Sequence, residues 1–142
     1  MTENPARRVV ATDRAPMPFA GAPYNQAVVS GDLVFCSGQL GLDPAGGALV
    51  EGGVEAQTRR ALANLEAVLE AAGSGLAAVL KTTVFVTDLA DFGTVNAVYA
   101  GVFPEQPPAR STVQVAALPG GGLVEIEAIA RVSEPPRGAA VS

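Results

Sequence analysis

The segment from Leu123 to Ala130 constrains the fold most strongly, because its side chains alternate along an extended chain. Glu125 and Glu127 fall on one face, and the aliphatic residues between them fall on the other. Alternation with a period of two predicts a β-strand, since successive side chains of a strand point to opposite faces. Ile129 adds an aliphatic side chain to the face of the two carboxylates. Both faces of this strand are therefore predicted to need cover.

The other elements follow from helical spacing and from turn residues. Leucines recur at helical spacing within residues 54–72, and Gly73 is predicted to end this helix. A second helix is predicted from Asp91, which can cap it, and Pro104 stops it. Further strands are predicted at residues 8–11, 27–29, 33–37, 79–87 and around 110–113. The order β-β-β-α-β-α-β-β indicates an α+β or α/β sandwich with two helices on one face of a sheet.

The predicted strand at residues 79–87 is also apolar on both sides. Val84 and Val86 share one face, and Phe85 points the opposite way. Strands of this kind need packing partners on both faces, whereas two helices cover only one. The second face is therefore predicted to pack against other copies of the chain. A homo-oligomer is expected, with any site at the strand ends near a subunit boundary.

The length predicts one domain over residues 1–142. Its two ends, residues 1–7 and 133–142, are predicted to be loose. No apolar run approaches the ~18 residues of a membrane span, so no membrane partner is expected. No apolar segment follows the N-terminal arginines as it would in a signal peptide. The cytoplasm is therefore the expected location.

The rarest residue types limit the chemistry. Cys36 is the only cysteine, which rules out an internal disulfide, and its apolar neighbours predict a small buried hydrophobe. Histidine is absent, which excludes histidine-based triads and histidine-ligated zinc, so no metal is expected. Lys81 is the only lysine and the net charge is −5. Nucleic-acid binding needs a basic face, so nucleic acid is not an expected partner.

Two polar residues near strand ends form the candidate site. Pro107 and Pro108 hold the backbone extended just before Arg110. A lone arginine and a lone carboxylate, Arg110 and Glu125, can bind a small carboxylate substrate beside one activated water. The same two residues are equally typical of a surface salt bridge, and spacing alone does not separate these interpretations.

The distance between these two residues depends on the pairing of their strands. In a simple hairpin about the turn at Gly120, Arg110 would lie opposite a residue near Ala130 rather than Glu125. At ~3.3 Å per residue the pair would then be more than about 10 Å apart. Either the two strands are not direct neighbours, or the two side chains meet across a subunit boundary.

An ordered series of motifs closely resembles the YjgF/RidA family of reactive intermediate deaminases. The motifs are APYNQA at 22–27, SGQ at 37–39, KTTVFVTD at 81–88, PARSTV at 108–113 and VEIEAIA at 124–130. The resemblance runs from about Ala15 to Arg131, nearly the whole chain. It implies a chorismate-mutase-like α+β fold, with two helices packed on one face of the sheet, assembled as a homotrimer with clefts between subunits.

The resemblance also implies an activity and its residues. The expected reaction is cofactor-free hydrolysis of 2-imino acids, and of the 2-aminoacrylate enamines that give rise to them, to 2-keto acids and ammonia. The carboxylate-binding arginine of the family falls on Arg110 and its water-handling glutamate on Glu125. The remaining substrate-binding positions fall on Tyr24, Ser37, Gly38 and Thr112.

The chain departs from the family pattern at several positions. Thr112 stands where the family often has cysteine, so thiol chemistry is not expected there. Ala22, Ala117 and Gly120 replace a glycine and basic residues that are common in the family. These changes affect the expected substrate range more than the reaction. Glu127 shares a face with Glu125 and is interpreted as structural or solvated.

Other functions stay open at this point. A non-catalytic, chaperone-like or sensor trimer could bind 2-keto acids in the same cleft, although carboxylate binding alone needs only Arg110. A hydrolase of a larger imine, such as an aminomuconate-type compound, is a further alternative. Ribonuclease activity or translation inhibition, also attached to the family, fits poorly with an acidic chain that has no histidine.

Overall fold

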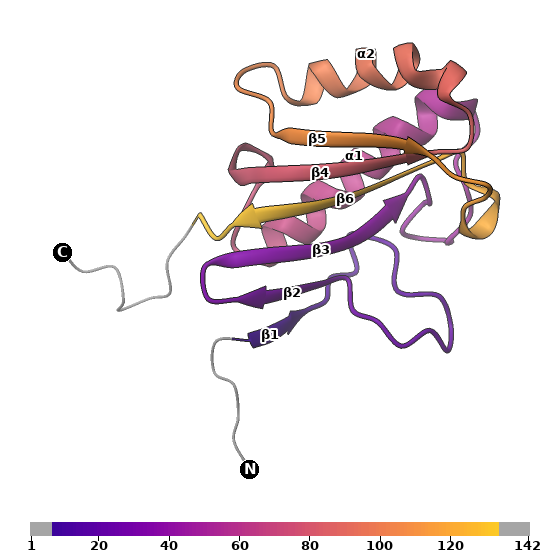
Figure 1. Ribbon diagram of the computed structural model, residues 1–142. Helices are drawn as coiled ribbons and strands as arrows, with labels where there is room; N and C mark the ends of the chain where they lie inside the picture. The colour runs from indigo at the N-terminus through magenta and orange to yellow at the C-terminus, as the bar shows by residue number, and fades with distance from the viewer. Residues whose placement is uncertain (1–6, 134–142) are drawn as a thin grey trace.

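The computed structural model describes residues 7–133, which form one mixed six-stranded sheet and two α-helices (Figure 1). The strands are β1 (Arg7–Val10), β2 (Ala27–Ser30), β3 (Leu33–Leu40), β4 (Val79–Val86), β5 (Ala109–Gln114) and β6 (Val124–Arg131). The helices are α1 (Gly53–Ala71) and α2 (Phe92–Val102). Short 3₁₀ turns precede β4, α2 and β6. This is the element order that the sequence predicts, and it confirms the α+β class.

The last strand in the chain lies at the centre of the sheet. The strand order is β1-β2-β3-β6-β4-β5, in which β6 runs antiparallel to both β3 and β4. β5 pairs in parallel with β4, as a crossover through α2 requires. β4 therefore separates β5 from β6, which confirms that the strands carrying Arg110 and Glu125 are not direct neighbours.

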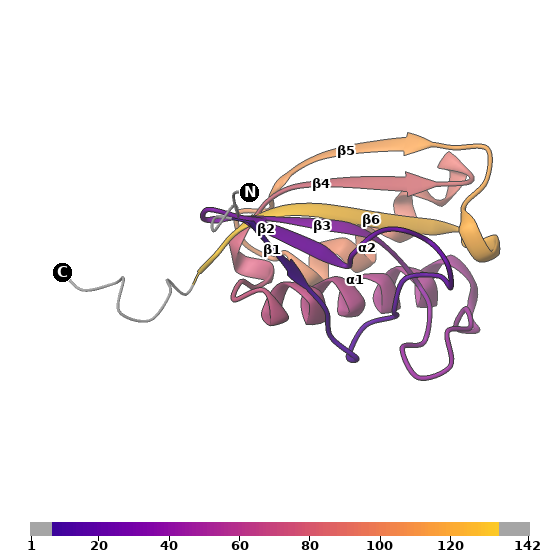
Figure 2. The same cartoon turned by 90° about the horizontal axis from the view of Figure 1, so that it is seen from below.

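Both helices cover the same side of the sheet, as Figure 2 shows in the view along its edge. The buried stripe of α1 includes Leu62, Leu65 and Leu69, which pack against alternate residues of the central strands. Gly73, with a φ of 83°, follows the helix in a left-handed conformation that favours glycine. Within residues 7–133, no helix has the length and apolar character needed to span a membrane.

Two details of the predicted elements are wrong. The third strand does not end at Ser37, because an irregularity between Cys36 and Gln39 interrupts the ladder with β6, which then resumes to Leu40. Asp91 does not cap α2 with its side chain. Asp88 instead accepts a hydrogen bond from the Ala90 amide and caps the 3₁₀ turn that leads into the helix.

The face opposite the helices carries exposed apolar side chains, as its two-sided pattern predicts. Phe35 and Ile129 are paired across β3 and β6, and Val113 pairs with Phe85 across β5 and β4. Phe35 and Val113 are each more than 40% exposed, at 43% and 42%. No helix of the described part lies over this face (Figure 2).

The two ends of the described chain are held by backbone contacts. β1 starts at Arg7 and pairs with β2. The Ser133 amide donates a hydrogen bond to the Gly73 carbonyl at 3.0 Å. The other residues that the sequence predicts to be loose, 1–6 and 134–142, lie outside the described residues.

Candidate functional site

The Glu125 carboxylate lies directly over the backbone of Gly38. A Cβ atom built on Gly38 would lie 2.7 Å from both Cδ and Oε2 of Glu125. Only a residue without a side chain leaves room for the carboxylate in this position. The contact occurs at the irregularity of β3, where bulges commonly redirect side chains next to active sites. The structure thus brings together two of the residues that the sequence predicts for the site.

A small cavity opens beside this contact. Its volume is about 30 Å³, which accommodates a water molecule. Tyr24, Gly38 and Glu125 all line it, together with residues of the loop that precedes Tyr24. Tyr24 is 42% exposed, and its hydroxyl accepts a hydrogen bond from the Phe19 amide at 3.3 Å. The carboxylate therefore borders a water-sized space that Tyr24 also lines.

Ser37 and Gln26 support this corner of the molecule. The Ser37 hydroxyl donates to the Asn25 carbonyl at 2.6 Å and so ties β3 to the segment that follows Tyr24. Gln26 is fully buried, and its amide nitrogen donates to the carbonyls of Thr12, Ala15 and Pro16. Gln26 was not among the predicted site residues. Its signals in the sequence are its place in the APYNQA motif and a polar amide directly before an apolar strand.

Burial raises the pKa of Glu125, and the negative charge of Glu127 raises it further. Glu127 lies on the same face of β6 and is exposed, in agreement with its interpretation as a solvated residue. A half-buried carboxylate with a raised pKa is a better proton acceptor than an exposed one at neutral pH. Glu125 is thus chemically suited to take a proton from a bound water.

Arg110 lies on the other side of the sheet. It pairs with Thr82 of β4, on the face that the helices cover, and its guanidinium Cζ lies 4.8 Å from the ring centroid of Tyr99 in α2. Glu125 pairs with Phe85 on the opposite face. Within one chain, Arg110 and Glu125 therefore lie two strands apart and on opposite faces of the sheet.

Thr112 lies on the same face of β5 as Arg110. Its hydroxyl is buried and has no hydrogen-bond partner among residues 7–133. The side-chain oxygen of Asn96, in α2, is buried and unpartnered in the same part of the chain. The predicted site residues thus form two groups, with Tyr24, Ser37, Gly38 and Glu125 in one and Arg110 and Thr112 in the other.

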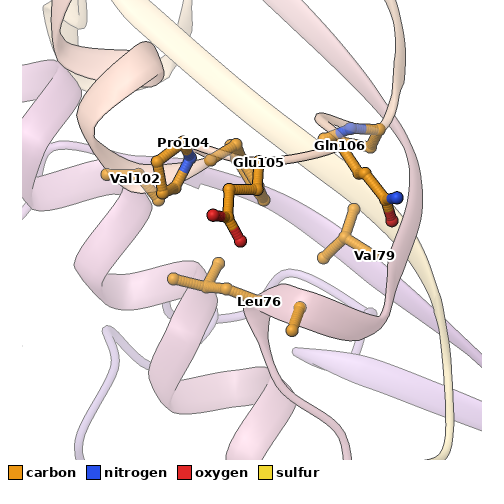
Figure 3. Close-up of a pocket in the computed structure, with 9 residues that line it drawn as sticks. Leu76, Val79, Val102, Pro104, Glu105 and Gln106 are labelled. Atoms are coloured by element: carbon orange, nitrogen blue, oxygen red, sulfur yellow. The ribbon is translucent and has the colours of Figure 1, made fainter.

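A much larger cavity than the one beside Glu125 lies away from both groups (Figure 3). It has a volume of about 660 Å³ between the end of α2 and the 3₁₀ turn at Leu76–Ala78. Its lining includes Leu76, Val102 and Glu105, and none of the predicted site residues. Size alone therefore does not mark the candidate site. Among residues 7–133, no group of three or more carboxylate or cysteine side chains could hold a metal ion.

Comparison with known proteins identifies the family. A family model described as Endoribonuclease L-PSP matches residues 12–132. The chain is 51% identical to the 2-iminobutanoate/2-iminopropanoate deaminase of Mus musculus over 124 residues, which cover 87% of this chain and 90% of that protein.

This chain belongs to the YjgF/RidA family.

Solved structures of the YjgF/RidA family share the fold. RidA from the Antarctic bacterium Psychrobacter sp. PAMC 21119 is 47% identical, with a TM-score of 0.83 over 87% of this chain and 98% of that one. Escherichia coli TdcF, solved with bound serine, is 42% identical, with a TM-score of 0.82 over the same shares. The match confirms the family resemblance that the sequence motifs predict from about Ala15 to Arg131.

Cys36 is expected to play no chemical part in the RidA-type site. Burial raises the pKa of its thiol to about 12, so the thiol stays protonated and unreactive. We expect Cys36→Ala to keep most of the activity while losing a small amount of stability through the cavity it leaves. Steady-state kinetics and thermal unfolding of the purified variant test this. A folded variant without turnover would contradict it.

Proposed function

We propose that this chain hydrolyses 2-imino acids, and the 2-aminoacrylate enamines that give rise to them, to 2-keto acids and ammonia. The observation that carries the proposal is the half-buried Glu125 carboxylate, held over Gly38 beside a water-sized cavity. The reaction itself comes from relatives about half identical to this chain, whose names describe deamination of 2-iminobutanoate and 2-iminopropanoate.

The chemistry needs orientation, one water and proton transfer. A protonated imine is already electrophilic at its C=N carbon. In the proposal, Arg110 binds the substrate carboxylate through two parallel charge-assisted hydrogen bonds, which fixes the position of that carbon. Glu125 orients the attacking water and accepts its proton. The negative charge of Glu125 also favours the iminium form of the substrate.

The proposed cleft lies between two copies of the chain. Arg110 and Glu125 lie on opposite faces of the sheet within one chain, so a shared site requires the arginine of one copy and the glutamate of another. The exposed apolar face, with Phe35 and Val113, supplies a surface on which copies can pack. We propose a homotrimer with the cleft at each subunit boundary.

The trimer is the first testable consequence. We expect light scattering coupled to size-exclusion chromatography to give about three times the chain mass at micromolar concentration. Phe35→Lys should shift this equilibrium towards smaller species, because it places a charge on the apolar face. A wild-type protein that stays monomeric under these conditions would contradict both the trimer and the shared cleft.

A coupled assay tests the reaction. A threonine or serine dehydratase generates the imino acid, and the rate of 2-ketobutyrate or pyruvate formation is measured with and without this protein. Faster keto-acid release supports hydrolysis. An unchanged rate, with measurable binding of 2-keto acids by calorimetry, supports instead a ligand-binding role, which the serine bound to Escherichia coli TdcF makes a serious alternative. An endoribonuclease, as the family description names it, fits poorly with a net charge of −5.

A further inference from the structure

The Arg110 guanidinium lies over two aromatic rings of α2, those of Tyr99 and Phe92, which together form an aromatic platform. Its Cζ atom lies 4.8 Å from the ring centroid of Tyr99 and 5.5 Å from that of Phe92, both within the ~6 Å range of a cation–π interaction. Among residues 7–133, the structure gives this guanidinium no hydrogen bond and no ion pair. The Cζ atom lies over both rings, and the hydrogen-bond donors of a guanidinium are its N–H groups, none of which is used within the described residues. The donors are therefore free to bind a carboxylate while the rings hold the group.

Tyr99 is the fixed half of this platform. It is only 5% exposed, and its hydroxyl and that of Thr82 form a hydrogen bond of 2.7 Å. Thr82 is fully buried in β4 and lies directly beside Arg110 in the parallel pairing of β4 and β5. The Tyr99 ring also packs on Phe103 at 4.8 Å between centroids. Both ends of Tyr99 are thus anchored in the core.

Phe92 is the less constrained half of the platform. It is 41% exposed, although it begins the apolar face of α2. An exposed ring has more rotamer freedom than one that is packed and hydrogen-bonded. Tyr99 therefore determines the direction of the guanidinium more strongly than Phe92 does.

We propose that the ring of Tyr99 orients the Arg110 guanidinium for bidentate carboxylate binding, which makes Tyr99 a positioning residue. Tyr99 acts through Arg110 and does not itself contact the substrate. This inference rests on the proposed function, in which Arg110 binds the substrate carboxylate. A bidentate contact needs the plane of the guanidinium in a defined orientation, and a long side chain without support samples several rotamers. Loss of the Tyr99 ring should therefore weaken substrate binding more than it slows the step at Glu125.

The test compares variants that separate the ring from the hydroxyl. Tyr99→Leu removes the ring, Tyr99→Phe keeps the ring and removes the hydroxyl, and Val95→Ala destabilises the same helix without removing a ring. We expect Tyr99→Leu to weaken 2-ketobutyrate binding roughly 3- to 30-fold and to raise KM by a similar factor, with little change in kcat. Tyr99→Phe and Val95→Ala should each change the affinity by less than about 3-fold. Should Tyr99→Leu not fold, Tyr99→Met replaces it, because methionine fills irregular core space.

Nuclear magnetic resonance of the ligand-free protein gives a second readout, the chemical shifts of the Arg110 side chain. These shifts would not change if Tyr99 only stabilised the fold. The side-chain Nε–Hε and Hδ signals of Arg110 should be shifted by the ring currents of the platform. The shift should largely disappear in Tyr99→Leu and persist in Tyr99→Phe and Val95→Ala. A folded Tyr99→Leu variant with wild-type affinity, or with an unchanged Arg110 signal, overturns the proposal. If the wild-type protein binds no keto acid, the proposed function fails, and the Arg110 signal alone then decides whether Tyr99 orients the guanidinium.

Discussion

Glu125→Gln is expected to lower kcat for imine hydrolysis by roughly 10²- to 10⁴-fold, the usual effect of removing a general base. Glutamine keeps the shape and the hydrogen-bonding reach of the side chain over Gly38 but cannot accept the proton of the water. Binding of pyruvate or 2-ketobutyrate, measured by calorimetry, should stay constant or tighten, because a negative charge has left the cleft. The coupled dehydratase assay measures the change in kcat.

The pH dependence of the wild-type enzyme is part of the same prediction. The base works only when it is ionised, so the rate should fall as the pH falls through the pKa of Glu125. Burial, and then the charge of Glu127, raises this pKa. The acid limb of the pH–rate profile should therefore lie at higher pH than for an ordinary glutamate. Glu127→Gln is the matched control, because it removes the exposed neighbour, and it should move the limb to lower pH while keeping activity. A Glu125→Gln variant with wild-type turnover would assign the base to Glu127 or to a backbone-held water.

Arg110→Ala is expected to abolish measurable turnover and to weaken 2-keto acid binding strongly. The substrate carboxylate then loses its only proposed cationic partner, and the C=N carbon is no longer held near the water. Arg110→Lys should restore only part of the activity, because an ammonium group cannot reproduce the two-pronged contact or the fit to the aromatic rings.

Arg59→Ala is the matched control for this arginine. Arg59 is exposed in α1 and pairs with Glu55 one helical turn away, so its removal should leave kinetics and ligand binding unchanged. Calorimetry with 2-ketobutyrate and the coupled assay compare the variants. Normal binding and turnover in Arg110→Ala would show that the substrate carboxylate is held elsewhere.

The sequence predicts the elements well because local pattern and tertiary packing agree in them. The structure has a strand where the alternation predicts β6 and a helix where the spacing predicts α1. The ends of both elements differ from the predicted ends by about one residue. The predicted end of the third strand at Ser37 is wrong because Ser37 and Gly38 interrupt the pairing with β6. In the sequence, a break in pairing looks the same as the end of a strand. The order of the strands depends on contacts far apart in the chain, and periodicity carries no information about them.

The sequence selects a set of candidate site residues, but it does not predict how they are arranged. Motif resemblance selects Arg110 and Glu125, and only the strand order shows that they lie on opposite faces. The support from Tyr99 and Thr82 was not predicted, because a tyrosine at helical spacing is most simply interpreted as core. The close approach of Glu125 to Gly38 likewise depends on the irregularity in β3, which no pattern in the sequence predicts.

Two inactive chains are expected to rescue each other when they are mixed. Because Arg110 and Glu125 lie on opposite faces of one chain, each proposed site takes one of them from each of two neighbours. In trimers assembled at random from equal amounts of Arg110→Ala and Glu125→Gln chains, about one quarter of the boundaries combine two intact contributors. Co-refolding the two variants should therefore restore about a quarter of wild-type turnover, whereas mixing them without subunit exchange should restore none. Two defective alleles of such a gene would then complement each other inside a single cell.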